Sequence, residues 1–239
     1  MQGFFGRKIR IPDGKKTASI NKLASLTQLK TLQLQNNEEI ISDGTVGKMT
    51  QMNSLTWSLI NLEILPNDIR NMSKLRRLVL LEYFHLVKMD YNFYDFQYLG
   101  YLKFVGCHFL EELPHLHKLK GLRQLEIIEC PRVSKFPTEF GHKGAFPLLE
   151  TFSLAWLPTL KELPVIEKGA MASLKIFTIM PCTTLNILPE SYMDLKTLQK
   201  VRIFGCPIRN IGTRENTNVE VMAMSMVDME EITKRYSQL

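Results

Sequence analysis

Four cysteines and a cluster of histidines are the side chains of this sequence with the most distinctive chemistry. The cysteines are Cys107, Cys130, Cys182 and Cys206. The segment CHFLEELPHLH adds three histidines to the first of them, namely His108, His115 and His117. Thiolates and imidazoles could bind zinc, an activated thiol could act as a nucleophile, and paired thiols could form disulfides. Choosing among these chemistries requires knowledge of the elements that position the side chains.

The sequence repeats itself with a period of about 24 residues. The pattern LxxLxxLxL, in which each L stands for a large apolar residue, occurs eight times at intervals of 23 to 27 residues. The copies begin at Leu26, Met49, Met72, Phe96, Leu119, Phe146, Met171 and Leu195. Every copy fills all four apolar positions, which a composition with 45% hydrophobic residues would not give by chance.

Each copy predicts one short strand followed by a return segment. The closing LxL has the two-residue period of a strand. Apolar-proline pairs such as Leu113-Pro114 and Leu163-Pro164 follow it, and proline prevents the strand ladder from continuing. A unit this short cannot bury its apolar side alone, so the copies must stack. We therefore predict a β-rich α/β solenoid with a parallel sheet on its concave face and extended segments or short helical turns on the return path.

These motifs resemble a known family. LKTLQLQNNEEI, YLKFVGCHFL and QLEIIECPRV follow the leucine-rich-repeat signature LxxLxLxx(N/C)xL. FVGCHFLEELP and LPTLKELP look like the repeats of plant intracellular disease-resistance proteins of the nucleotide-binding, coiled-coil type. The resemblance implies a curved horseshoe fold and a cytoplasmic role in innate immunity. In that role the repeats bind a pathogen effector, a guarded host protein or an adjoining nucleotide switch domain, which they restrain.

The sequence departs from the full-length family pattern in one respect. It holds no GxxxxGK(S/T) phosphate loop, so the switch domain would lie elsewhere. Ile11-Pro12 and the apolar steps after it resemble the tail of an earlier repeat, which suggests a fragment or a truncated relative of a longer receptor. The alternative is a freestanding cytosolic leucine-rich-repeat signalling scaffold, and an enzyme subunit is a third interpretation with little support among the residues.

Three parts are expected along the chain: a basic N-terminal segment (1–25), the repeat array (26–211) and a C-terminal cap (212–239). In the cap, NVEVMAMSM alternates like one more strand, and Ser225 with Asp228 has the spacing of a helix capping box. The formal charge of +6 arises within residues 1–30, where seven basic residues accompany one acid. Because this charge is local and lacks interleaved aromatic residues, we expect no nucleic-acid partner. No apolar run is long enough to span a membrane.

The repeat explains the cysteines without any reaction. All four lie three residues after the second apolar residue of an LxL, where the first copy has Asn37. In a stacked array this position points inward, and its side chain serves backbone groups along a ladder. The spacing in CHFLEELPHLH matches no usual zinc pattern, and disulfides are rare in the cytosol. We therefore predict no catalytic residue, metal site, cofactor or small-molecule substrate.

The concave face is the predicted site of protein recognition. The position after each LxL is apolar in six successive copies, and these six residues are called the apolar stripe: Leu81, Val105, Ile128, Ala155, Met180 and Phe204. Stacked strands would make the stripe about 24 Å long. It is either an exposed partner site or a satellite core covered by the following loop.

Polar residues beside the stripe complete the predicted site. Arg77, Tyr101 and Lys103 are residue types common at the centre of binding interfaces, while Trp156 either contacts a partner or packs beneath the stripe. The predicted partner-binding residues are Arg77, Leu81, Tyr101, Lys103, Val105, Glu126, Ile128, Trp156, Met180, Arg202 and Phe204. The longest interval contains EFGHKGAF, whose glycines predict a protruding flexible loop.

Overall fold

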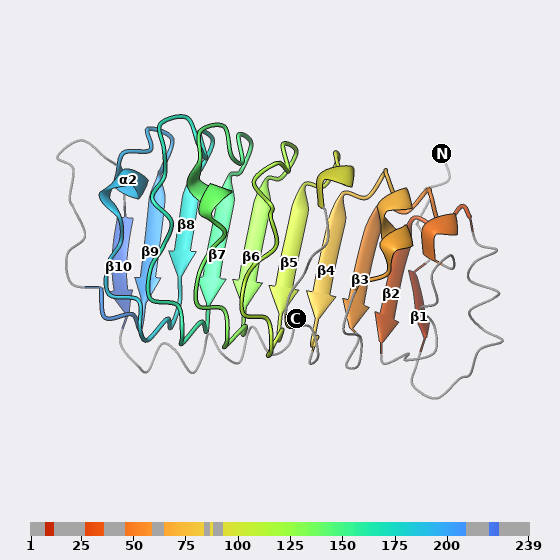
Figure 1. The fold of residues 1–239 in the computed structure, drawn as a ribbon, viewed down its shortest axis with the longest axis horizontal. Coiled ribbons are helices and arrows are strands. Elements are labelled where there is room, and N and C mark those ends of the chain that lie inside the picture. The colour runs from red at the N-terminus through yellow and green to blue at the C-terminus, as the bar shows by residue number, and fades with distance from the viewer. Residues whose placement is uncertain are drawn as a thin grey trace.

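The repeated LxL segments form one parallel sheet. The computed structural model describes residues 8–11, 27–35, 46–58, 65–83, 87, 93–208 and 220–224. Within them, ten strands pair side by side in chain order (Figure 1). They are β1 (Lys8–Ile11), β2 (Thr31–Gln35), β3 (Ser54–Ser58), β4 (Arg77–Leu81), β5 (Tyr101–Val105), β6 (Gln124–Ile128), β7 (Thr151–Ala155), β8 (Ile176–Ile179), β9 (Lys200–Phe204) and β10 (Glu220–Met224). Strands β2 to β9 carry the eight predicted copies, which confirms the leucine-rich-repeat solenoid.

Two strands extend the sheet beyond the eight copies. Strand β1 pairs with β2 and places Ile9 beside Leu32 and Ile11 beside Leu34. Part of the basic N-terminal segment is therefore a strand, where the sequence predicted only the tail of an earlier repeat. Strand β10 pairs with β9, as the alternation in NVEVMAMSM predicts. The helix expected after Ser225 lies outside the described residues.

Register keeps the apolar positions of every copy in line. The first apolar residue of each LxL pairs with its counterpart in the next strand, as Leu102 does with Leu125, and the second does likewise, as Phe104 does with Ile127. These four side chains have no exposed surface. Burying one such side chain stabilises the fold by about 1.5 to 3 kcal/mol, so the stacked rows supply the main stabilising term.

Aromatic residues fill the core under the C-terminal strands. The rings of Phe152 and Phe177 stack with centroids 5.2 Å apart and an interplanar angle of 8°. Tyr192 continues the stack, 4.8 Å from Phe177 at 14°. Tyr192 belongs to α2 (Glu190–Met193), so this stack joins the sheet to a return segment.

The return segments are extended or contain single helical turns, as predicted. The described turns are η1 (Val46–Lys48), η2 (Asn67–Asn71), η3 (Phe93–Asp95), η4 (Thr138–Gly141) and α2. They lie in front of the strands in Figure 1 and so cover one face of the sheet. Each of the later return segments also buries one apolar residue completely, namely Leu110, Val133, Leu160 and Leu185.

A left-handed residue turns the chain out of most strands. Glu82, Gly106, Glu129, Trp156 and Gly205 each follow the apolar stripe directly and have φ between 52° and 67°. The backbone amides of Glu82, Gly106 and Glu129 still donate hydrogen bonds to the last residue of the next strand. Their acceptors are the carbonyl oxygens of Val105, Ile128 and Ala155, respectively. The turn directs the following residue inward, which accounts for the inward position predicted for Cys107, Cys130 and Cys206.

The segment EFGHKGAF is packed, so the prediction of a protruding flexible loop is wrong. Residues Phe140, Gly141, Ala145 and Phe146 are buried. The amide of Glu167 donates to the Gly141 carbonyl oxygen over 2.9 Å, and a Cβ at Gly141 would collide with the Val165 carbonyl group. Glycine is therefore needed here because two neighbouring coils approach closely.

Candidate protein-binding surface

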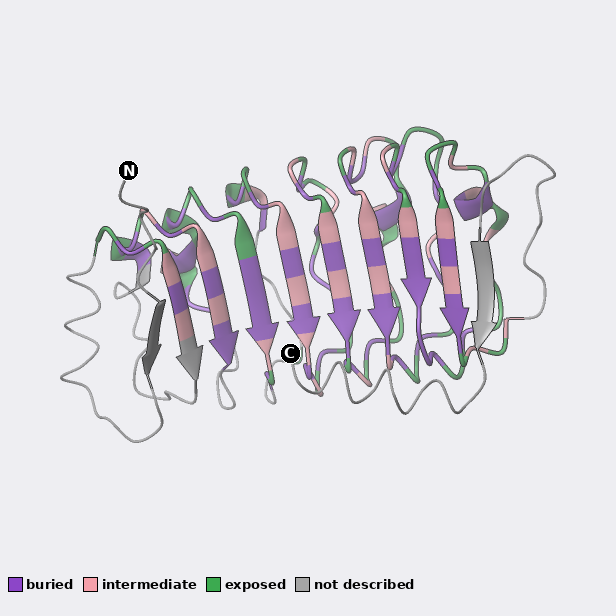
Figure 2. Cartoon of the chain, turned by 180° about the vertical axis from the view of Figure 1, so that it is seen from behind, coloured by how far each residue is buried: buried purple, intermediate pink, exposed green. Residues whose placement is uncertain are grey.

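The uncovered face of the sheet forms an open groove. Side chains from β2 to β9 line it around a volume of about 1010 Å³. Figure 2 shows the sheet from this side, with half-buried and buried residues alternating along most of the strands. Nine of the eleven predicted partner-binding residues line the groove: Arg77, Leu81, Tyr101, Lys103, Val105, Glu126, Met180, Arg202 and Phe204.

A connected set of polar side chains occupies the floor of this groove on β4, β5 and β6. The guanidinium carbon of Arg77 lies 3.8 Å from the ring centroid of Tyr101. The Tyr101 hydroxyl donates a hydrogen bond of 3.0 Å to Oε1 of Glu126. Stacking on an aromatic face orients the planar guanidinium and fixes where its charge lies.

Glu126 is the centre of this set, which we call the central network: Arg77, Tyr101, Lys103, Gln124 and Glu126. Nζ of Lys103 lies 3.4 Å from Oε2 of Glu126, and Nε2 of Gln124 donates to Oε1 over 2.6 Å. The side chains of Lys103 and Glu126 are only 13% and 12% exposed. An ion pair this sheltered is screened less than a surface pair and also carries hydrogen bonds, so it holds the network in one geometry.

The protonation state of Tyr101 suits its role as a donor. Its pKa is raised to about 12, chiefly by burial and also by the negative charge of Glu126, while the nearby Arg77 opposes both effects. The hydroxyl group is therefore protonated throughout the neutral range and donates to the Glu126 carboxylate. Gln124 was not among the residues predicted from the sequence to bind a partner. Its position two residues before Glu126, on the same side of the strand, could have indicated that it belongs to the site.

Basic side chains dominate the charge of the groove. Among the described residues that line it, Arg77, Lys103 and Arg202 are basic and Glu126 is acidic. Arg202 is half-buried on β9, five strands from Arg77, which corresponds to about 24 Å at the usual spacing of strands. A partner that follows the groove would therefore meet positive charge at both of these positions.

Most of the apolar stripe is covered. Ile128, Ala155, Met180 and Phe204 are 0 to 6% exposed and form a cluster separate from the main core. This supports the satellite-core alternative at these four positions. Ile128 does not line the groove at all, whereas Met180 and Phe204 line it although they are only 4% and 6% exposed. Leu81 and Val105 remain half-buried.

Trp156 packs beside the stripe instead of lining the groove. It is half-buried, contacts the cluster of Ile128, Ala155, Met180 and Phe204, and has φ of 52°. A bulky residue in the left-handed region costs about 1 to 2 kcal/mol. The contact with the stripe offsets this strain, which supports the packing alternative for Trp156.

The cysteines occupy the inward ladder. Cys107, Cys130 and Cys182 are fully buried and Cys206 is half-buried. Sγ of Cys130 donates to the Ile128 carbonyl oxygen over 3.3 Å, and Sγ of Cys206 accepts the Cys182 amide over 3.4 Å. Burial raises the pKa of the Cys130 thiol well above its usual range. These are the properties of structural thiols, not of activated nucleophiles.

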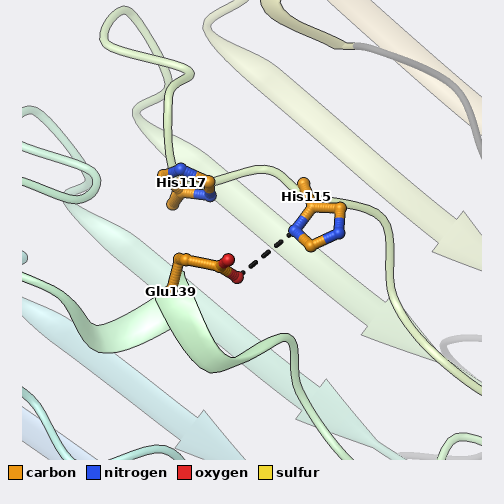
Figure 3. A group of neighbouring side chains, drawn as sticks. All are labelled: His115, His117 and Glu139. Carbon is orange, nitrogen blue, oxygen red and sulfur yellow. Dashed lines mark ion pairs between the residues drawn. The ribbon is translucent and has the colours of Figure 1, made fainter.

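Two histidines of CHFLEELPHLH lie beside a glutamate that was not grouped with them from the sequence. His115 and His117 lie beside Glu139 of η4, whereas the neighbouring Cys107 is buried in the core (Figure 3). His115 and Glu139 are 24 residues apart, which is about one repeat period. The repeat period could therefore have predicted that these residues of adjacent coils lie side by side.

None of the helical turns in the described segments is long and apolar enough to cross a bilayer.

Comparison with known proteins establishes the fold of this chain but not its family. No protein-family model and no curated protein matches the sequence. The chain is similar to the leucine-rich repeat domain of the type III effector XopL, with a TM-score of 0.64 and 21% identity over 83% of this chain. It spans 65% of the length of that chain. At this identity the similarity shows a leucine-rich-repeat solenoid and no more.

A second similar structure is an internalin from Listeria monocytogenes. It is 16% identical over 85% of this chain and 69% of the other, with a TM-score of 0.43. That superposition is too partial to carry an argument about this protein.

Proposed function

We propose that this protein is a recognition module that binds a protein partner in the groove, with the central network as the main contact. The observation that best supports this proposal is that Tyr101 is held between Arg77 and Glu126. Its ring centroid lies 3.8 Å from the guanidinium carbon of Arg77, and its hydroxyl oxygen lies 3.0 Å from Oε1 of Glu126. Side chains fixed in this way lose little conformational freedom when a partner binds. Tyrosine and arginine are also the types that most often dominate binding energy.

The shape and charge of the groove favour a protein over a small molecule. Sites for small ligands are enclosed and mostly apolar, whereas this groove is open and extends across eight strands. Arg77 and Arg202 suit a partner that presents acidic side chains toward both ends of the groove. Such charge complementarity accelerates association and selects against basic partners.

The more specific proposal is that the chain is the leucine-rich-repeat part of a plant intracellular immune receptor. The motifs FVGCHFLEELP and LPTLKELP support it by resemblance. In this role the groove would bind a pathogen effector, a guarded host protein or the receptor's nucleotide switch domain, in the cytoplasm. A freestanding signalling scaffold is the alternative, in which the groove still binds protein but no switch domain is restrained.

The test is a binding titration between this chain and the purified nucleotide switch domain of the receptor to which it belongs. The groove variant is Arg77→Ala with Tyr101→Ala. The control variant is Tyr98→Ala, because Tyr98 is 63% exposed and does not line the groove. We expect the groove variant to weaken binding by tenfold or more and the control to bind as the parent does, since a hot-spot side chain contributes about 2 kcal/mol.

The outcomes separate the two levels of the proposal. Equal losses in both variants, or none in either, would contradict the groove as the contact site. A switch domain that does not bind at all would contradict the receptor proposal and favour the scaffold, whose partner is then sought with the same pair of variants.

A further inference from the structure

Three potential metal ligands converge on the return-segment face, away from the groove. His115 and His117 lie between β5 and β6, and Glu139 lies in η4 between β6 and β7. One nitrogen of each imidazole and one carboxylate oxygen all lie within 4.8 Å of one another. Figure 3 shows the three side chains directed toward a common point, with Nδ1 of His115 and Oε2 of Glu139 3.3 Å apart.

These distances suit one tetrahedral ion. Zinc binds imidazole nitrogen and carboxylate oxygen at about 2.0 to 2.2 Å, which places neighbouring ligand atoms about 3.4 Å apart. The His115 to Glu139 distance of 3.3 Å already matches this value. The remaining separations are at most 4.8 Å, so small rotations of the exposed His115 and the half-buried His117 and Glu139 would close the site.

One shielded atom of the group lacks a hydrogen-bond partner. Among the described residues, Nδ1 of His117 has none although it is shielded from solvent, and the shielded Oε2 of Glu139 makes no hydrogen bond and has only its ion pair with His115. The Glu139 carboxylate is otherwise accessible, with its side chain 41% exposed. A shielded polar atom without a partner is unfavourable, and a shared cation would bind Nδ1 of His117 together with the Glu139 carboxylate.

The protonation states also suit metal binding. Burial lowers the pKa of His117, and the charges of Lys118, His115 and Lys120 lower it further against the opposing effect of Glu139. The pKa of Glu139 is lowered chiefly by a hydrogen bond from its own backbone amide, with His115, His117 and His142 contributing. A neutral imidazole and an ionised carboxylate are the forms that bind a metal ion.

We propose that His115, His117 and Glu139 bind one divalent transition-metal ion of the zinc type, with water as the fourth ligand. Two imidazoles favour such an ion over magnesium or calcium, which prefer oxygen ligands only. The ion would link the segment after β5 to η4 of the next coil. Its binding would therefore stabilise the stacking of these two coils as well as occupy the site.

The rings around His117 leave little freedom for its imidazole. Its centroid lies 5.8 Å from that of Tyr94 at an interplanar angle of 75°, and 6.2 Å from that of His115 at 84°. The ammonium group of Lys118 lies 4.5 Å from the Tyr94 ring centroid. These contacts position His117 toward Glu139, so the ligands are partly preorganised.

The test is calorimetric titration of the full chain with zinc chloride at neutral pH. His117→Ala and Glu139→Gln each remove one ligand. His108→Ala is the matched control, since it removes a histidine of the same return segment outside the group. A Cys206→Ser background removes the one half-buried thiol that could bind zinc elsewhere.

We expect one equivalent of zinc to bind the parent and the control with equal affinity. Each ligand variant should bind at least about tenfold more weakly, the smallest loss typical of disturbing a metal site. Magnesium chloride should give no binding. Cobalt(II) added to the parent should produce the visible absorption of a tetrahedral site, and this absorption should be absent in both ligand variants.

Two results would overturn the proposal: a parent chain that does not bind zinc, or ligand variants that bind it as tightly as the parent. Circular dichroism checks that each variant is folded, and His115→Ala provides a third independent ligand variant should one of the others fail to fold. The groove variant Arg77→Ala with Tyr101→Ala should bind zinc normally, so this test is independent of the proposed protein-binding function.

Discussion

Two parts of the groove differ in how their side chains are packed. On β4 to β6, Arg77, Tyr101 and Glu126 form a polar network that faces the groove. From β6 to β9, the position that follows each LxL presents the part of the apolar stripe that is 0 to 6% exposed. On β6 the polar network and the satellite core lie only two residues apart, at Glu126 and Ile128.

The difference arises from what packs around the stripe. Ile128, Ala155, Met180 and Phe204 form one cluster, and Val105 and Trp156 pack against it. Leu81 is not part of this cluster and stays half-buried. Apolar character in the stripe therefore does not by itself indicate a binding surface, because its residues can form a satellite core.

The largest expected effect separates the two ends of the stripe. Ile128→Asp should lower the free energy of unfolding by about 4 kcal/mol, because a carboxylate replaces a side chain in a closed apolar cluster. Leu81→Asp should cost only about 1 kcal/mol, because Leu81 is half-buried at the open end. Urea denaturation of both variants measures the two values. Equal costs would show that the stripe is uniform after all.

Removal of one hydroxyl group tests the central network. Tyr101→Phe keeps the ring beneath Arg77 and deletes the hydrogen bond to Glu126. We expect a loss of about 1 kcal/mol in the free energy of unfolding, because Glu126 keeps Lys103 and Gln124 as partners. Ser153→Ala on β7, two strands from Tyr101, is the control, with a smaller cost. A neutral Tyr101→Phe would mean that the hydroxyl is equally well served by water.

The same tyrosine makes stability depend on pH at the alkaline end. Its pKa rises from 10.0 to about 12 in the folded protein, so the folded state retains a proton that the unfolded state loses. Its contribution to stability is therefore complete below pH 10 and is lost as the pH rises through 12. The difference between the tyrosinate absorbance of the parent and of Tyr101→Phe should titrate near the upper value. A midpoint near 10 would contradict the buried environment.

The smallest effect concerns the inward ladder. Brief alkylation of the folded protein should modify Cys206 first, because it is half-buried while Cys107, Cys130 and Cys182 have no exposed surface. A hydrogen bond shared with Cys182 also lowers the pKa of Cys206, which increases the reactive thiolate fraction. Mass spectrometry of the adducts identifies the site. Modification of Cys130 at the same rate would show that the ladder is open.

The sequence period predicted the fold well because each apolar residue needs only the equivalent residues of the adjacent repeats to be buried. Each LxL lies in the strand expected for it, and the return segments described after β5 to β8 bury Leu110, Val133, Leu160 and Leu185, since stacking requires only that neighbouring copies keep the same register. The N-terminal strand β1 was missed because its apolar residues, Ile9 and Ile11, do not fill a complete repeat pattern.

The candidate site was harder to predict because it depends on contacts between copies. The composition of the stripe does not reveal that Trp156 folds onto it. Glycines in EFGHKGAF suggested mobility, but Gly141 instead permits close packing against Val165. Grouping Glu139 with His115 requires knowing which return-segment positions of adjacent coils lie side by side. A sequence pattern predicts the position of a residue within its repeat more readily than it predicts which residues of the adjacent repeats it contacts.

The most direct test of the central claim is site-specific photo-cross-linking in cells that express the full chain. A photoreactive phenylalanine analogue replaces Tyr101 in the groove or Val165, which is 69% exposed on a return segment outside it. Binding through the central network predicts a discrete protein adduct from position 101 that is absent from position 165. Adducts of equal yield from both positions, or from position 165 alone, would contradict the groove as the recognition surface.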